Sequence, residues 1–151
     1  MKLALGMLST LAMVAPLAGC SQGVSASAQE SVERAAGSVG LAAAKVIEGV
    51  GSLDVASMSP EALVQRASWL LRWCTDQLEE VHDAKTAEAV GAAIEEVLDA
   101  ADGLLEQAVA EMPNRGEVHM KIKDLRDRHM SNSSILLVLD PALARLNSLL
   151  E

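Results

Sequence analysis

The feature that most constrains the fold is a long helical repeat of apolar residues in the middle of the chain. The positions recur at alternating spacings of three and four: Ala87, Val90, Ile94, Val97, Ala101, Leu104 and Ala108. Because an α-helix has about 3.6 residues per turn, this spacing places all of them on one helix face. Thr86 can cap the start, and Pro113 prevents the helix from continuing. The repeat therefore predicts a helix of residues 86–108 that must bury one side against other elements.

Two earlier segments show the same spacing. Residues 32–50 predict a first helix, although Gly37, Gly40 and Gly49 each weaken a helix by up to about 1 kcal/mol relative to Ala. A second helix is expected to start with Ser59 as N-cap and to run to about Val81. The expected inward positions are Val32, Ala36, Val39, Ala43, Val46 and Val50 in the first helix, and Leu63, Ala67, Leu70, Cys74, Leu78 and Val81 in the second.

The last third of the chain predicts one further helix and a less regular tail. Residues 113–116 form a turn signal, so the next helix should run antiparallel to the third. Ser133 or Ser134 could cap a helix containing ILLVL, residues 135–139, and Asp140–Pro141 could start another. ILLVL is apolar on every side and is expected to be covered. The expected inward positions are Val118, Ile122, Leu125 and His129, followed by Leu143, Leu146 and Leu150.

Composition supports a helical fold without strands. The chain has no Phe or Tyr, and its β-branched residues are scattered at helical spacing instead of alternating. We therefore expect residues 30–151 to form a single all-α domain, an antiparallel bundle of about four to five helices.

The N-terminus has the layout of a secretory signal. Lys2 precedes a mostly apolar run that extends to Gly19. Pro16 disfavours a continuous core helix, and the run is shorter than the roughly 20 unbroken apolar residues that a membrane span needs. Residues 1–19 are therefore interpreted as a signal peptide.

The four residues that end this run, LAGC at 17–20, resemble the lipobox of bacterial lipoproteins. The resemblance implies that signal peptidase II recognises Leu17, Ala18 and Gly19, cuts before Cys20, and leaves Cys20 lipidated. Residues 20–29 would then form a flexible linker, with acyl chains as the membrane anchor. The residue after Cys20 is Ser21. An Asp at this position would resemble an inner-membrane retention signal, so its absence favours the outer membrane. The expected location is the bacterial cell envelope, facing the periplasm or the cell surface.

Charge limits the partners of the processed chain. Removal of residues 1–19 from 151 leaves 132 residues with all 21 acidic and 11 of the 12 basic residues, a formal net charge of −10. A nucleic-acid ligand is not expected, because phosphate binding needs a basic surface. Anionic headgroups would also be repelled, so the acyl chains must supply the membrane attachment.

The sequence names no reaction. His82, His119 and His129 could gather with Glu79 and Asp83 around a metal, but their spacing matches no metal-binding motif. Cys74 lies in a helix seam and is interpreted as an inert core thiol. The chain also lacks a nucleophile elbow, a phosphate loop and a dinucleotide fingerprint. We expect neither catalysis, nor a cofactor, nor a metal.

Two surfaces are candidates for partner binding. Trp69 and Trp73 lie one turn apart beside the second seam, and either flank the core or form an exposed binding stripe. An acidic stripe consists of Glu95, Asp99, Asp102 and Glu106, with no Lys or Arg between residues 86 and 112. It is either a solvated face partly relieved by the basic segment 115–128, or a docking site for a basic periplasmic protein.

These features together predict a non-catalytic, lipid-anchored envelope protein that acts through protein contacts. Two alternatives stay open. One is a carrier of a small ligand or metal, which would use a pocket between Ala-rich helices. The other is a membrane-tethered inhibitor or adaptor of another envelope protein.

Overall fold

The computed structural model describes residues 26–151, and within the first helix it describes the side chains of Glu30 and of residues from 33 onward. The expected signal peptide, the recognition residues 17–19, Cys20 and the first part of the linker lie outside the described residues. The first helix begins at Ala26, so residues 26–29 are helical and do not belong to a flexible linker.

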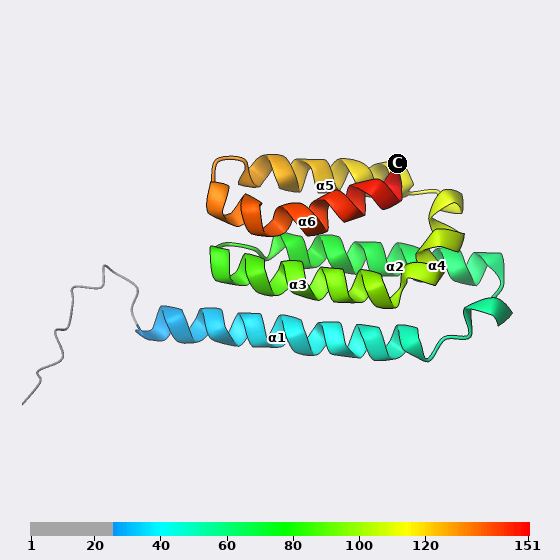
Figure 1. Cartoon of the computed structure of the whole chain (residues 1–151), viewed down its shortest axis with the longest axis horizontal. Helices are drawn as coiled ribbons and strands as arrows, with labels where there is room; N and C mark the ends of the chain where they lie inside the picture. Colours follow the sequence, from blue (N-terminus) through cyan, green and yellow to red (C-terminus); the bar gives the residue numbers. More distant parts are fainter. Residues whose placement is uncertain (1–25) are drawn as a thin grey trace, which may run out of the picture.

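Residues 26–151 form six α-helices and no strand, which confirms the expected all-α bundle. The helices are α1 (Ala26–Gly51), α2 (Pro60–Glu79), α3 (Ala84–Ala100), α4 (Asp102–Ala108), α5 (Arg115–His129) and α6 (Ser133–Leu150). Two 3₁₀ turns, η1 (Val55–Ser57) and η2 (Val109–Glu111), lie in the connections. The long helices that follow one another, α1, α2, α3, α5 and α6, run antiparallel, as Figure 1 shows.

Helix α3 is central to the packing, because it contacts both α1 and α6. Helix α5 packs between α6 and α2, and α2 also contacts α3 and α4. Since α1, α3 and α6 run in the same direction, the two most extensive contacts join parallel helices (Figure 1). The largest fully buried side chains are Leu70, Leu71, Leu78, Ile94, Leu98, Leu104, Leu105, Ile122, Leu125, Leu139, Leu143 and Leu146.

Capping side chains fix the starts of three helices, α2, α3 and α6. Ser59 caps α2 as expected, and its hydroxyl accepts a hydrogen bond from the Ala62 N–H at 3.3 Å. The cap of α3 is Asp83 and not Thr86, because the Asp83 carboxylate accepts the Thr86 N–H at 2.8 Å. The helix therefore starts at Ala84, earlier than a cap at Thr86 would allow.

The expected helix of residues 86–108 is divided at Ala101 into α3 and α4. Gly103 is a poor helix former, and Asp102 is favourable in a first turn, so these two residues favour a new helix start. The seam survives the break, since Ala101, Leu104 and Ala108 are all buried.

The tail forms the single helix α6, in agreement with the helical interpretation of ILLVL. Its N-cap is Asn132, not Ser133 or Ser134, and Pro141 lies inside the helix instead of starting another. The expectation that ILLVL is covered on every side was wrong, because Leu137 is 78% exposed and Val138 is 36% exposed. Of the described helices, α6 alone has the length and composition of a membrane span. One third of its residues are buried in the bundle, where α6 packs against α3 and α5.

Candidate functional site

The acidic stripe lies on the surface of α3 and α4. Asp99, Asp102 and Glu106 are exposed, and Glu95 is half-buried. The break at Ala101 leaves these side chains on the outside of the two helices, because the seam residues of both remain buried. The structure therefore presents the stripe to solvent.

The charge that relieves this stripe comes from α6. Arg145 contacts Asp99 at 2.5 Å and Asp102 at 3.9 Å. The expectation that segment 115–128 provides the relief was wrong, because α5 packs on α2 and α6. Its Lys121 contacts Asp76 and Glu79 of α2, and its Arg126 contacts Asp140 of α6. Among the described residues, Glu95 and Glu106 form no salt bridge.

The two tryptophans differ in burial. Trp73 is partly buried and packs against the core, whereas Trp69 is 48% exposed. The core interpretation therefore fits Trp73, and an exposed surface position fits Trp69. They do not form one exposed stripe.

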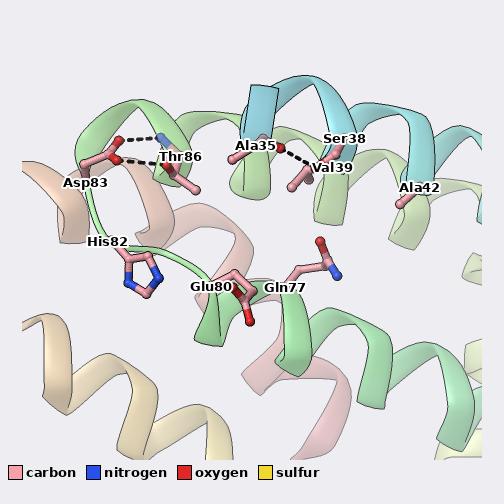
Figure 2. A pocket seen from close by; sticks show the side chains of 9 residues that line it. All are labelled: Ala35, Ser38, Val39, Ala42, Gln77, Glu80, His82, Asp83 and Thr86. Carbon is pink, nitrogen blue, oxygen red and sulfur yellow. Dashed lines mark hydrogen bonds between the residues drawn. The ribbon is translucent and has the colours of Figure 1, made fainter. Parts of the chain in front are cut away.

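A cavity of about 560 Å³ lies between the first half of α1 and the end of α2. Ala35, Ser38 and Ala42 of α1 form one wall. Figure 2 shows these small residues facing the opposite wall, to which Gln77 and His82 belong. Since short side chains leave this space unfilled, the Ala-rich character of α1 explains the cavity.

The polar side chains around this cavity differ in whether their oxygen and nitrogen atoms are free to bind a ligand. Both carboxylate oxygens of Asp83 are used, because they accept the Thr86 N–H and the Thr86 hydroxyl, at 2.8 and 3.0 Å (Figure 2). These hydrogen bonds favour the ionised carboxylate, and the backbone N–H of Thr86 is the main cause that lowers the pKa of Asp83. Glu80 and His82 are exposed at the cavity rim. This arrangement can hold a small polar molecule but brings no nucleophile beside a base.

A second, narrower space lies between α1 and α2 further along both helices. Its volume is about 70 Å³, and apolar residues such as Val46, Val50 and Leu70 line it. Lys45 of α1 and Arg66 of α2 also line this crevice. This crevice was not predictable from the sequence, because the two cations are 21 positions apart and neither belongs to a motif.

The histidines do not assemble a metal site. Within the described residues no group of three His, Cys, Asp or Glu side chains is close enough to hold a metal ion. His129 is buried, and burial is the main cause that lowers its pKa, followed by the positive charges of Arg128 and His82. Its Nε2 and the Nδ1 of His119 are buried without a hydrogen-bond partner.

Cys74 is fully buried in the seam of α2, as the core interpretation expects. Burial raises the pKa of its thiol to about 12, so the thiol stays protonated at neutral pH. A protonated and inaccessible thiol is a poor nucleophile.

No protein-family model matches the chain, and neither a curated protein nor a solved structure resembles it significantly. Functional assignment therefore depends on the residues of this chain.

Proposed function

We propose that this protein is a lipid-anchored, non-catalytic component of the bacterial cell envelope that binds a basic protein partner. The observation that carries the proposal is the acidic stripe of four aligned carboxylates on α3 and α4. Arg145 is the single described cation that forms a salt bridge with the stripe, and it contacts two of the four, Asp99 and Asp102. The outer membrane is the preferred location, with the domain facing the periplasm.

The physical argument concerns uncompensated charge. Like charges spaced i, i+4 on a helix cost a few tenths of a kcal/mol per pair, here Glu95 with Asp99 and Asp102 with Glu106. Arg145 is shared between Asp99 and Asp102, and it leaves both ends of the stripe without a cation. A partner that presents Lys or Arg along one face would remove this repulsion and gain a fast, salt-dependent association.

The binding site is tested by a charge reversal that spares the Arg145 contacts. The variant Glu95→Lys/Glu106→Lys changes the net charge by +4 and should abolish cross-links to the partner in native membranes. The matched control Glu117→Lys/Asp124→Lys makes the same change on exposed positions of α5 and should keep those cross-links. Equal cross-linking by both variants and the parent protein would refute the stripe as the docking site.

The anchor rests on the LAGC sequence and is tested separately. Two or more acyl chains on Cys20 would hold the protein firmly, since each buried methylene contributes about 0.8 kcal/mol. The variant Cys20→Ser should leave the precursor unprocessed by signal peptidase II, and intact mass should show both the retained leader and the missing acyl chains. A processed, equally membrane-bound variant would refute lipidation at this cysteine.

A second candidate function, carriage of a small ligand, is favoured by the cavity of about 560 Å³ between α1 and α2. Occupancy should raise the melting temperature of the full chain. Replacing Ala42 with Leu would occupy part of this space and should reduce that shift. An equal ligand-dependent shift in Ala42→Leu and the parent protein would place the ligand elsewhere.

A further inference from the structure

The crevice between Lys45 and Arg66 combines an apolar interior with a basic mouth. Val46 and Val50 of α1 and Leu70 of α2 are buried residues that line it. Gly49 also lines it, and a Cβ added there would meet no atom within 4 Å. The space beside Gly49 can therefore accept a side chain without displacing the helices.

The two cations at this crevice have no acidic partner among the described residues. Three other described cations at helix junctions are paired: Lys85 with Glu33, Lys121 with Glu79, and Arg145 with Asp99. Arg72 and Lys123 line other spaces between helices without a salt bridge, but each is the one unpaired cation at its site. In a chain with a formal net charge of −9, two unpaired cations from different helices at one opening are unusual. Their position suits an anion, which Arg can bind through two parallel hydrogen bonds.

A shallower depression of about 480 Å³ continues from the crevice over the surface of α2 and the segment that precedes it. The two spaces share Leu53, Arg66 and Trp69 as lining residues. Met58 and Ala62 provide further apolar surface. The exposed indole of Trp69 thus stands where both spaces meet, beside one of the two cations.

We propose that this crevice binds an anionic single-chain amphiphile, with its carboxylate or phosphate between Lys45 and Arg66. The alkyl chain would enter the crevice and continue along the apolar depression at Met58 and Ala62, because the crevice alone is too small for it. Each methylene removed from water contributes about 0.8 kcal/mol, so the chain supplies affinity and the headgroup supplies orientation. A neutral alcohol of equal length gains the burial of its alkyl chain but not the interaction of an anionic headgroup with the two cations. This inference depends on neither the acidic stripe nor the lipid anchor.

The same headgroup chemistry occurs in free amphiphiles and in phospholipids that stay in a bilayer. The enclosed part, about 70 Å³, is small and lies between two helices of the protein. A lipid would have to leave the bilayer to place its chain there. The ligand is therefore a dissolved molecule with one chain.

The test uses the full chain with Trp73→Phe, so that Trp69 is the remaining fluorophore. Decanoate and decyl phosphate, titrated below their micelle concentrations, should change the emission of Trp69 saturably. Decanol should bind at least tenfold more weakly, and acetate should have no effect. Failure of both decyl anions to bind would overturn the proposal, and so would equal binding of decanol.

Two matched pairs of variants locate the ligand. Lys45→Glu/Arg66→Glu should weaken decanoate binding at least tenfold, whereas Lys123→Glu/Arg128→Glu, which changes two unpaired cations of α5, should not. Gly49→Leu fills the crevice and should abolish binding, whereas Gly37→Leu on the exposed side of α1 should retain it. Circular dichroism would verify that every variant folds.

Vesicles distinguish the two sources of the ligand. Neutral phosphatidylcholine vesicles and vesicles with added phosphatidylglycerol should leave Trp69 emission unchanged in the absence of decanoate. A response to the anionic vesicles without a response to monomeric decanoate would overturn the proposal and identify the face as a membrane contact. Unchanged binding in Gly49→Leu would also overturn it, because the chain would then not enter the crevice.

Discussion

Helix α1 and the remaining helices bury very different side chains. The fully buried large residues all belong to α2 through α6, where Leu and Ile from three or more helices meet. Helix α1 contributes smaller residues, Val39, Ala43, Val46 and Val50, and packs mainly against α3. Figure 1 shows α1 as an outer layer along one side of the bundle.

This difference teaches where the molecule can bind something without rearranging its core. Small residues on α1 face the side of α2 that carries Leu70 and Gln77, and two spaces remain unfilled between these helices. Local stability follows buried apolar contacts, so α1 should open more readily than α3 or α6. Hence the α1–α2 junction is the adaptable part of the protein, and the Leu-rich bundle is its scaffold.

The largest expected effect compares one truncation in each region. Leu143→Ala in α6 should lower the free energy of unfolding by about 2–5 kcal/mol, because it leaves a cavity among fully buried neighbours. Val46→Ala in α1 removes fewer atoms from a layer that borders a crevice and should cost about 1 kcal/mol.

Urea unfolding followed by circular dichroism measures both values, and native-state amide exchange shows which helices respond. Val46→Ala should accelerate exchange in α1 without a comparable change in α6. If both truncations cost the same and accelerate exchange everywhere, α1 belongs to the cooperative core and the comparison fails.

The next effect concerns Asp83, which caps α3 and lines the cavity beside α1. Asp83→Ala should cost about 1 kcal/mol, as expected for loss of an N-cap. Asp83→Asn retains an acceptor and serves as control. Because the hydrogen bonds lower the pKa of Asp83 below 3.8, its stabilisation is present at neutral pH and is lost as the pH falls through the lower, folded-state value. Equal acid sensitivity of the parent protein and Asp83→Asn would contradict this assignment.

The helical bundle was predictable from the sequence because the 3–4 spacing of its apolar residues depends on local geometry. The inward positions of α2 and α5 were correct, including buried His129. The break at Ala101 was missed because the seam spacing continues across it without interruption. The Asp83 cap was missed because Thr86 and Asp83 are both good caps, and only the orientation of the chain entering α3 decides between them.

The candidate sites were harder to predict because they depend on which helices become neighbours. The acidic stripe was visible in the sequence, but α5 was expected to oppose it, and the contact comes from Arg145 on α6. Sequence order favours neighbours that follow one another, whereas α3 packs on α1 and α6. The Lys45–Arg66 crevice depends on the same information and left no signal in the spacing of residues.

A smaller effect concerns the pH dependence of stability that buried His129 gives to the core. Burial and, to a lesser degree, Arg128 and His82 lower the pKa of His129 below 6.5. His129 therefore binds a proton more readily in the unfolded chain than in the folded one. The contribution of His129 to the free energy of unfolding should therefore be complete above pH 6.5. It should decrease as the pH falls from 6.5 toward the folded-state pKa of His129.

His129→Phe should flatten this dependence between pH 7 and 5.5, measured by urea unfolding at each pH. His82→Gln removes one of the positive charges that oppose protonation, and should make the slope less steep. An unchanged slope in His129→Phe would assign the pH response to other groups.

The smallest expected effect tests whether charge holds α1 in place. Among the described side chains, the Glu33–Lys85 contact at 3.1 Å is the one salt bridge that joins α1 to another helix, and its partners are 68% and 53% exposed. Exposed pairs contribute roughly 0.2–1 kcal/mol and are screened by salt. Glu33→Gln should therefore lower the free energy of unfolding by less than about 1 kcal/mol, and 0.5 M NaCl should erase the difference from the parent protein. Glu30→Gln, which breaks a pair inside α1, controls for the loss of one charge. A larger loss in Glu33→Gln, with faster amide exchange throughout α1, would mean that an ion pair, and not the packing of α1 against α3, holds this helix on the bundle.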